Sequence, residues 1–318
     1  MHLRETICDY LKGKGIETSP SSILIVSGGL QALQLISIGL LQRGSVIFHE
    51  SPSYLNSIHV FQSAGMNLFG IPMDEEGIKY ASIGRLKRQH NPALIYTIPS
   101  FHNPTGTLMS EKRRKQLLED CQKASLPIIE DDVYGDLWFE QPPPKPLKAN
   151  DKQGSVLYMG SVSKTFSPGL RIGWIVGPEP VINRLADIKM QTDYGSSSIS
   201  QFLVNKWLKN GYEEDLTLVR SELKCRRDYM IEILNTYFSN IATWNIPSGG
   251  FYIWLKITPS ISTRKLFEKA IQEGILLNPG NIYDKDDHRH LRLSYSYATL
   301  DQIKKGLKRI SELIIEMM

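Results

Sequence analysis

The sequence predicts an α/β protein with a large, doubly wound domain and a smaller α+β domain after it. Two observations predict this fold. In the first two-thirds of the chain, short apolar segments alternate with stretches of helical pattern, and several segments are apolar on both faces, as parallel strands covered by helices are. After about residue 200 the pattern changes to longer helices and a few later strands. We therefore expect a seven-stranded, mostly parallel sheet whose ligand site lies at the carboxyl ends of its strands.

Each expected strand is short and rich in Ile, Val, Leu and Tyr. Helical candidates lie between the strands, and one begins after Ser110, a residue that suits the N-cap position. We expect an N-terminal helix within residues 1–18 that packs on the small domain, a large domain over 19–200 and a small domain over 201–318. The seven expected strands are 23–26, 45–50, 67–73, 93–99, 126–131, 155–161 and 171–177.

The composition excludes several classes of protein. With 318 residues, the chain is long enough for about two domains. Hydrophobic residues make up 41% and charged residues 22%, which excludes a disordered chain, and a formal charge of +4 does not indicate nucleic-acid binding. The three cysteines lie far apart, which argues against a disulfide scaffold or a cysteine zinc site and fits a cytoplasmic protein. Gly28-Gly29 interrupts the uncharged stretch between Glu17 and Arg43, so we expect a strand and a buried helix there rather than a membrane span.

The segment GSVSKTFSPGLRIGW (160–174) is the centre of the functional prediction. Lys164 follows an apolar strand and lies among small hydroxyl residues. An isolated lysine of this kind is usually a surface residue. A sheltered lysine, however, has a lowered pKa and condenses with aldehydes, so Lys164 is a candidate Schiff-base lysine. Ser161, Ser163 and Arg171 would then bind a phosphate beside it, and the segment lacks the GxxxxGK pattern of a nucleotide P-loop.

The segment VSGGLQAL (26–33) predicts a strand, a pair of glycines and then a helix. The open backbone amides at the start of such a helix bind phosphate readily. An ordinary tight turn between a strand and a helix would look the same. Gly28 and Gly29 are therefore phosphate-binding candidates only in combination with other motifs.

Two carboxylates end the expected strand IIEDD, at the edge of the sheet where ligands bind. Asp131 could hold a proton on a pyridine nitrogen, and Tyr134, three residues later, could reach the same ring. A helix cap explains an aspartate in this position equally well. A metal is the third alternative, but no histidine ligand set lies nearby, and we expect no metal.

Three further candidates stand at strand ends or on an alternating strand. Asn103, in the turn NPTG, supplies a neutral amide, and Tyr54 could stack on a flat ring. Arg292 alternates with leucines in LRLSYSYA, so it projects from the opposite face and could bind a carboxylate through two hydrogen bonds. Each has a structural alternative: a turn asparagine, a partly buried tyrosine and an arginine in a surface salt bridge.

Together and in this order, SGGLQAL, Tyr54, NPTG, EDDVY, SVSK and LRLSYS resemble the motifs of the fold type I pyridoxal-phosphate aminotransferases of class I. The resemblance covers essentially the whole chain. The segments DIKMQTDYGSSSISQ (187–201) and PSGGFYIWLKI are most similar to the aminotransferase-like domain of MocR-type transcription regulators of the GntR family. In those regulators a winged-helix DNA-binding domain precedes the aminotransferase-like domain.

The resemblance implies pyridoxal 5'-phosphate (PLP) as the cofactor and a role for each candidate. Lys164 would form the internal aldimine, Asp131 would contact the pyridine nitrogen, and Tyr134 and Asn103 would bond the ring hydroxyl. Arg292, with Asn103, would bind the substrate α-carboxylate. Where the family usually has a Ser-Gln pair, this chain has Gly-Leu, so only main-chain donors remain there. The residues implied to hold the ring or the phosphate are Gly28, Gly29, Leu30, Tyr54, Ser161, Ser163 and Arg171.

The resemblance leaves more than one function open. The first is transamination between an amino acid and a 2-oxo acid, in which the freed Lys164 moves the Cα proton as general base and acid. The second is effector sensing, in which an amine forms an external aldimine without turnover. A PLP-dependent lyase is the third. We expect an amino acid or amine as ligand, a homodimer, no membrane contact, and DNA contact only through a winged-helix domain absent from this chain. Only 27 residues precede Gly28, so we also expect the family's amino-terminal arm to be missing or truncated.

Overall fold

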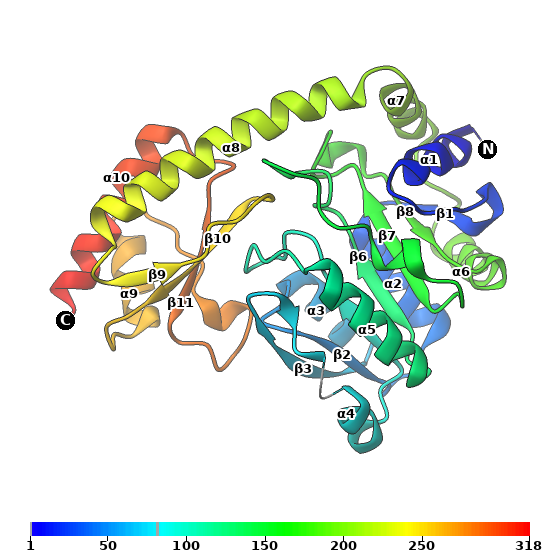
Figure 1. Ribbon diagram of the computed structural model, residues 1–318, viewed down its shortest axis with the longest axis horizontal. Coiled ribbons are helices and arrows are strands. Elements are labelled where there is room, and N and C mark those ends of the chain that lie inside the picture. The colour runs from blue at the N-terminus through cyan, green and yellow to red at the C-terminus, as the bar shows by residue number, and fades with distance from the viewer. Residues whose placement is uncertain (1, 81–82) are drawn as a thin grey trace.

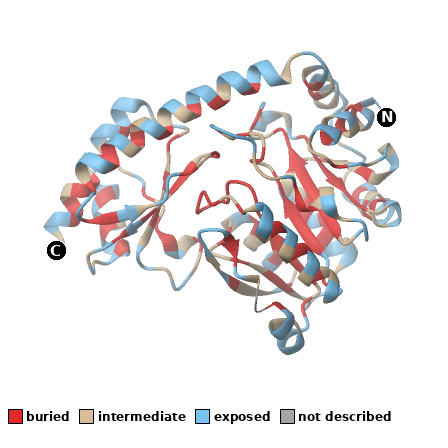
Figure 2. Ribbon diagram, viewed as in Figure 1, coloured by how far each residue is buried: buried red, intermediate tan, exposed pale blue. Residues whose placement is uncertain are grey.

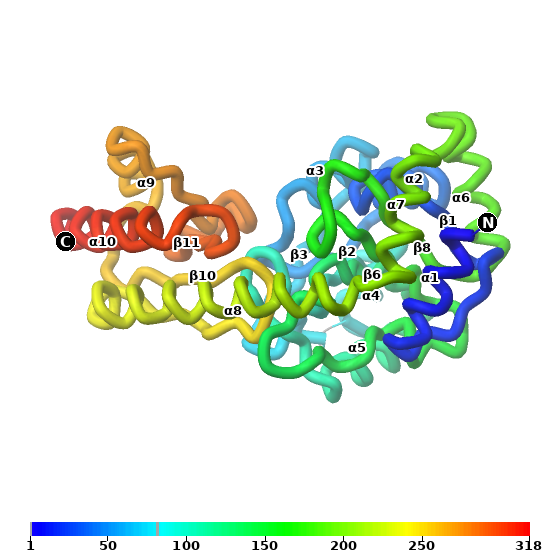
Figure 3. The backbone as a smooth tube through the Cα atoms, turned by 90° about the horizontal axis from the view of Figure 1, so that it is seen from above, coloured from blue at the N-terminus to red at the C-terminus, as the bar shows by residue number. Residues whose placement is uncertain are grey.

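The structure, a computed structural model, describes residues 2–80 and 83–318. A large sheet with helices on both faces forms one part of the molecule, and a small sheet packed with helices forms the other (Figure 1). The long helix α8 (Tyr212–Tyr237) runs from the large part to the small one, as two views at right angles show (Figure 1, Figure 3). Residue 1 of the expected N-terminal helix lies outside the described residues.

Within the described residues, the large sheet has eight strands in the order β1-β8-β7-β6-β5-β2-β3-β4. All seven expected strands are present at the expected places. Strands β3, β2, β5, β6 and β7 are parallel to one another, whereas β8 is antiparallel to both of its neighbours. One strand of this sheet, β4, was not expected. It pairs with β3 across a turn and is too short for an alternating pattern to predict it. The bounds are β1 (Ile23–Val26), β2 (Val46–Ser51), β3 (Asn67–Asp74), β4 (Gly77–Ile78), β5 (Leu94–Thr97), β6 (Ile128–Asp131), β7 (Val156–Ser161) and β8 (Gly173–Val176).

Helices cover both faces of the large sheet because successive residues of a strand point to opposite sides. Ile47 and Ile129 pack on the face covered by α2, α3 and α6, and their neighbours Phe48 and Ile128 pack on the face covered by α4 and α5. Figure 2 shows the buried strands between helices whose outer sides are exposed. The doubly wound α/β class is therefore confirmed. The helices are α1 (His2–Gly13), α2 (Gly29–Leu40), α3 (Leu55–Ser63), α4 (Ile83–His90), α5 (Glu111–Lys123), α6 (Glu179–Thr192), α7 (Ser198–Lys209), α9 (Thr263–Gln272) and α10 (Leu300–Glu316).

The smaller part is a three-stranded antiparallel sheet in the order β11-β10-β9. Its buried residues, among them Ile253 and Leu255 of the central strand, share a core with α8, α9 and α10. Helix α10 begins with a capping box, in which Thr299 and Gln302 each satisfy a backbone amide of the other. The strands are β9 (Ala242–Trp244), β10 (Tyr252–Ile257) and β11 (His290–Ser294).

The N-terminal helix has two packing partners. We expected residues 1–18 to pack on the small domain. Ile7 of α1 shares a buried cluster with Val204 of α7, which lies in the range expected for that domain, and also with Trp174 of β8 in the large sheet. Helix α1 lies beside α7 (Figure 3). The apolar stripe of a helix shows that it packs but not against which partner, so the sequence pattern could not decide this point. The domain boundaries at residues 18 and 200 stay predictions.

The uncharged stretch before Arg43 forms β1, a turn and α2, as expected. Among the described residues, no helix combines the length and the hydropathy that a membrane span requires.

Candidate functional site

A cavity of about 120 Å³ lies where β6 and β7 end and α2 begins. This is the edge at which an open α/β sheet binds its ligands. Residues from five separate segments of the chain meet there. Two predicted residues lie just behind this lining: Gly28 lies against Arg171, and Arg292 is bonded to Asn103. The predicted residues on the lining are Gly29, Leu30, Tyr54, Asn103, Asp131, Tyr134, Ser161, Ser163, Lys164 and Arg171.

Asp131, the last residue of β6, is buried, and only one of its two carboxylate oxygens has a hydrogen-bond partner. Its Oδ2 accepts a hydrogen bond from the Tyr96 hydroxyl at 2.7 Å. Its Oδ1 is fully buried and has no partner among the described residues. Burial raises the pKa of Asp131 to about 6, in spite of the hydrogen bond from Tyr96. A buried carboxylate oxygen without a donor is costly, so this atom marks a place for a ligand that brings one.

The neighbouring aspartate has a different role. Asp132 Oδ2 accepts from the Tyr158 hydroxyl at 2.8 Å and forms an ion pair with Lys14 at 3.2 Å. The two carboxylates therefore do not share a site. In the part of the chain that the structure describes, no group of His, Cys, Asp and Glu residues is arranged to hold a metal ion.

The turn between β1 and α2 is shaped for an anion. Gly28 has φ of +93°, and a Cβ there would lie 2.4 Å from Arg171 Nη2, so the position requires glycine. Arg171 itself has φ of +54°, and its Nη2 donates to the Ser27 carbonyl at 2.8 Å. Because Gly28 is the N-cap of α2 and has no side chain, no cap covers the first amides of the helix. These amides and the guanidinium are suitable ligands for a phosphate.

Two serines follow β7 on the same side. Ser161 Oγ lies 2.9 Å from both Ser163 Oγ and the Ile172 carbonyl, which fixes the pair beside the cavity. Lys164 comes next, in the turn after β7, and is half-buried. Its amine has no hydrogen bond or ion pair with another described residue, and it lines the cavity. A lysine placed in this way is free to react with a bound aldehyde.

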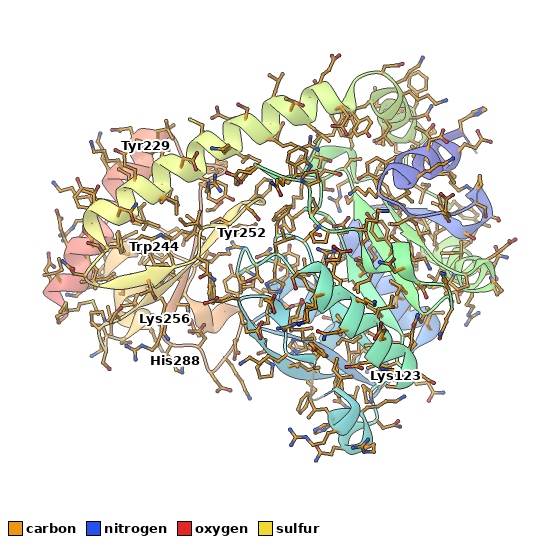
Figure 4. All side chains as sticks on the ribbon, viewed as in Figure 1. Lys123, Tyr229, Trp244, Tyr252, Lys256 and His288 are labelled. Atoms are coloured by element: carbon orange, nitrogen blue, oxygen red, sulfur yellow. The ribbon has the colours of Figure 1, made fainter. Side chains whose placement is uncertain are left out.

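Arg292 of β11 reaches the site from the small part of the molecule. Its Nη1 donates to Asn103 Oδ1 at 2.9 Å, and its Nε is buried without a partner among the described residues. The guanidinium lies over the rings of Tyr252 and Tyr283, with its carbon 4.2 and 5.0 Å from the two ring centres. Tyr252 lies on the side of β10 that faces the large part of the molecule (Figure 4). The arginine is therefore held in place, and its Nε is left without a partner in the described protein.

Tyr54 lines the cavity from the N-cap position of α3. Its hydroxyl accepts from Asn56 Nδ2 at 2.9 Å, and burial raises the pKa of the phenol, so the ring stays neutral. Tyr134 packs edge-on against Tyr252, and its hydroxyl lies 3.4 Å from Asn103 Nδ2. The two tyrosines bring aromatic surface and a hydroxyl to one cavity.

The sequence pattern missed three residues of this site. Tyr96 lies within an apolar strand and reads as a core residue, although it is the sole described donor to Asp131 Oδ2. Tyr252 and Tyr283 come from two distant segments and meet only around Arg292. A clue to Tyr252 was available, because it follows the paired glycines of PSGGFYIW.

The fold is that of the fold type I aminotransferases. The model of the family "Aminotransferase class I and II" matches residues 1–310, and the chain belongs to that family. Among solved structures, kynurenine aminotransferase of Pyrococcus horikoshii, in complex with PMP, has a TM-score of 0.94 and 34% identity over 99% of this chain and 80% of its own. LysN, the α-aminoadipate aminotransferase of Thermus thermophilus, solved with N-(5'-phosphopyridoxyl)-L-leucine, has a TM-score of 0.92 and 29% identity over 99% of this chain and 81% of its own.

A curated relative with a different kind of name is more similar in sequence. The HTH-type transcriptional regulator YisV of Bacillus subtilis is 59% identical over 311 residues. The match covers 98% of this chain but only 64% of YisV. The chain thus resembles enzymes in structure and part of a regulator in sequence.

Proposed function

We propose that this chain binds PLP in the cavity of Asp131 and Lys164 and transfers an amino group between an amino acid and a 2-oxo acid. The observation that carries the proposal is the buried Asp131 Oδ1, which has no donor in the described protein and shares a cavity with the Lys164 amine and an open helix start. The protonated pyridine nitrogen of PLP is a donor of the kind that this oxygen lacks. The residues present therefore fit the cofactor.

Each end of the cofactor has a counterpart in the chain. When bound, PLP supplies an electron-accepting ring that stabilises negative charge at the substrate Cα. Asp131 would keep the proton on the ring nitrogen, and that positive charge would in turn favour the ionised carboxylate. The first amides of α2, the two serines after β7 and the Arg171 guanidinium would hold the phosphate.

The remaining groups act on the substrate. Arg292 Nη1 is already bonded to Asn103, and the buried Nε, which has no partner among the described residues, can donate to an α-carboxylate. Asn103 and the two tyrosines that flank the guanidinium fix its plane. Lys164 would move the proton that transamination requires: as a base it would take the proton from the substrate Cα, and as an acid it would deliver it to the carbon that carried the aldehyde.

The substitution Lys164→Ala tests this function. We expect the variant to lose the visible absorbance of lysine-bound PLP and to lose transamination by roughly a thousandfold or more, because it lacks both the covalent partner and the proton carrier. Absorbance spectra with a panel of amino acids, together with assays of the 2-oxo acid product, measure both effects. Lys152→Ala, at an exposed loop position, is the matched control. A wild-type protein that develops no visible band with PLP, or a Lys164→Ala variant that keeps it, would contradict the proposal.

The identity with YisV favours a second function, effector sensing. The same cavity would bind an amine at the PLP aldehyde without turnover, and the change would be transmitted to a DNA-binding domain of the kind that the name of YisV indicates. The spectra described above distinguish the two functions. Sensing predicts that an amine changes the absorbance while no 2-oxo acid accumulates, and transamination predicts that both occur.

We also propose that the chain forms a homodimer through α6, α7 and the loop between them. Large apolar side chains are exposed there, which is typical of a surface that another molecule covers. The exposed apolar residues are Met190, Tyr194, Ile199, Phe202 and Leu203. Sedimentation of the wild-type chain and of a Phe202→Glu variant tests the dimer, with loss of the dimer expected in the variant.

We propose the cytoplasm as the location of the protein. The free cysteines Cys8, Cys121 and Cys225 suit this reducing compartment.

A further inference from the structure

The loop between α6 and α7, residues 193–197, belongs to the proposed dimer surface and also contacts the cavity's surroundings. Its first residue, Asp193, is bonded to Gln31 at the start of α2. Gln31 lies just after the turn between β1 and α2 that would hold the phosphate, which we call the phosphate turn (residues 27–28). Gln31 Nε2 donates to Asp193 Oδ2 at 2.7 Å, and Ser196 Oγ lies 3.4 Å from Ser27 Oγ. Residues more than 160 positions apart in the sequence thus meet directly behind the turn between β1 and α2.

Gln31 connects this loop to the arginine that would hold the phosphate. Its Oε1 accepts from the Ser27 backbone amide at 2.7 Å, and this bond orients the amide nitrogen toward Asp193. The carbonyl of the same Ser27 accepts from Arg171 Nη2 at 2.8 Å. Both backbone groups of Ser27 are therefore fixed, one by the glutamine and the other by the arginine. A displacement of Gln31 would move the Ser27 peptide groups and, with them, the guanidinium.

The position of Gln31 in α2 explains why it leaves the anion site open. Gln31 is the third residue of the helix, where the side chain of a capping box normally bonds the amide of the N-cap residue. Here it bonds the amide one residue earlier, that of Ser27. Because Gly28 has no side chain, the first amides of α2 have no cap. The turn is braced from behind while these amides stay available to a ligand.

The other end of this chain of bonds is anchored in α6. Lys189 is 5% exposed and forms an ion pair with Asp193 Oδ1. The hydrogen bonds from Lys189 and Gln31 lower the pKa of Asp193, although its partial burial acts in the opposite direction. Asp193 is therefore a charged acceptor for Gln31, and the lysine neutralises a carboxylate that would otherwise repel a nearby phosphate.

We propose that Gln31 and Asp193 are positioning residues for the phosphate group of PLP. They hold the Ser27 peptide groups and, through them, Arg171, in the geometry that binds a phosphate. The inference rests on the proposed binding of PLP in this cavity. It assigns to the loop at 193–197 the task of supporting the phosphate turn, and it predicts that the support matters only for ligands that carry a phosphate.

The test compares PLP with pyridoxal, which has the same ring and aldehyde but no phosphate. Titrations followed by visible absorbance give the affinity of each for the wild type, for Gln31→Leu and for Gln34→Leu, an exposed glutamine one turn further along α2. Gln31→Leu should bind PLP roughly tenfold or more weakly, since it breaks a bond to a charged group and releases the turn, and should bind pyridoxal within about twofold of the wild type. Gln34→Leu should change neither affinity.

Two further measurements separate positioning from a loss of folding. Asp193→Ala alters a partly exposed loop residue and should weaken PLP selectively as well. In the double variant Gln31→Glu with Asp193→Asn, the donor and the acceptor are exchanged, so PLP should bind more tightly than to Gln31→Glu alone. The phosphorus NMR shift of bound PLP should change in Gln31→Leu and not in Gln34→Leu.

The outcomes distinguish this inference from the function on which it rests. A wild-type chain that binds neither PLP nor pyridoxal overturns the proposed function together with this inference. If the wild type binds PLP and Gln31→Leu weakens PLP and pyridoxal equally, or weakens neither, the inference is overturned and the proposed function stands.

Discussion

The neighbouring aspartates at the end of β6 have nearly the same burial and opposite surroundings. Asp131 and Asp132 are both 6% exposed. One oxygen of Asp131 has no donor in the described protein, whereas Asp132 bonds the Tyr158 hydroxyl and the Lys14 ammonium. The difference follows from the alternation of side chains at a strand end, which sends Asp131 to the cavity and Asp132 toward the residues that follow α1.

The comparison shows how a functional carboxylate differs from a structural one. A buried carboxylate that is paired with a hydroxyl and a cation of the protein, as Asp132 is, stabilises the folded state. A buried carboxylate with an unused oxygen costs stability in the free protein, and this cost is offset when a ligand donates to it. We therefore expect substitutions at Asp131 to affect chemistry and substitutions in the Lys14–Asp132 pair to affect folding.

The largest effect is expected for Asp131→Asn. The amide cannot hold a proton on the ring nitrogen as a carboxylate does, so transamination should fall roughly a hundredfold to ten-thousandfold, and the melting temperature of the variant should not fall. Steady-state kinetics of the purified variant, with calorimetry alongside, measure both quantities. A variant that keeps wild-type kcat would show that the unpaired oxygen has no catalytic role.

The second-largest effect is expected for Lys14→Met, which removes the cation paired with Asp132. Burial alone would lower the pKa of Lys14, but Asp132 and Asp136 raise it well above its ordinary value. Lys14→Met leaves these carboxylates without their cation, so the free energy of unfolding should fall by roughly 3 kcal/mol. Urea denaturation measures the loss, and adding Asp132→Asn should recover part of it. The kcat of the folded fraction should be unchanged. A large fall in kcat would contradict the purely structural role that we assign to the Lys14–Asp132 pair.

The smallest effect is a pH dependence of stability in the protein without cofactor. The pKa of Asp131 is about 6 in the folded chain, above its ordinary value of 3.8, so the folded state binds the extra proton between these values. Stability from this group is present at low pH and is lost as the pH rises through about 6, by roughly 2 to 3 kcal/mol. The difference between wild type and Asp131→Asn, measured by denaturation from pH 4 to 7, isolates this contribution from that of Glu130. A difference that does not vary with pH would contradict the assignment.

Much of the fold was predictable because each expected strand is a compact apolar run with helical sequence between most of them. The lining of the cavity was predictable for a related reason: parallel strands deliver their carboxyl ends to one edge, so Asp131 and Lys164 had to lie close together. What could not be predicted depends on contacts between distant segments. Tyr96 looks like any core residue of its strand, and the bond between Gln31 and Asp193 leaves no local pattern. The contact of α1 with β8 was missed for the same reason.

Nitrogen NMR of the protein loaded with PLP labelled at the ring nitrogen tests the central claim most directly. It reports whether Asp131 Oδ1 is paired with an N–H donor in the bound state. We predict a protonated ring nitrogen in the wild type at neutral pH and an unprotonated one in Asp131→Asn. An unprotonated nitrogen in the wild type, or the same signal in both proteins, would contradict it.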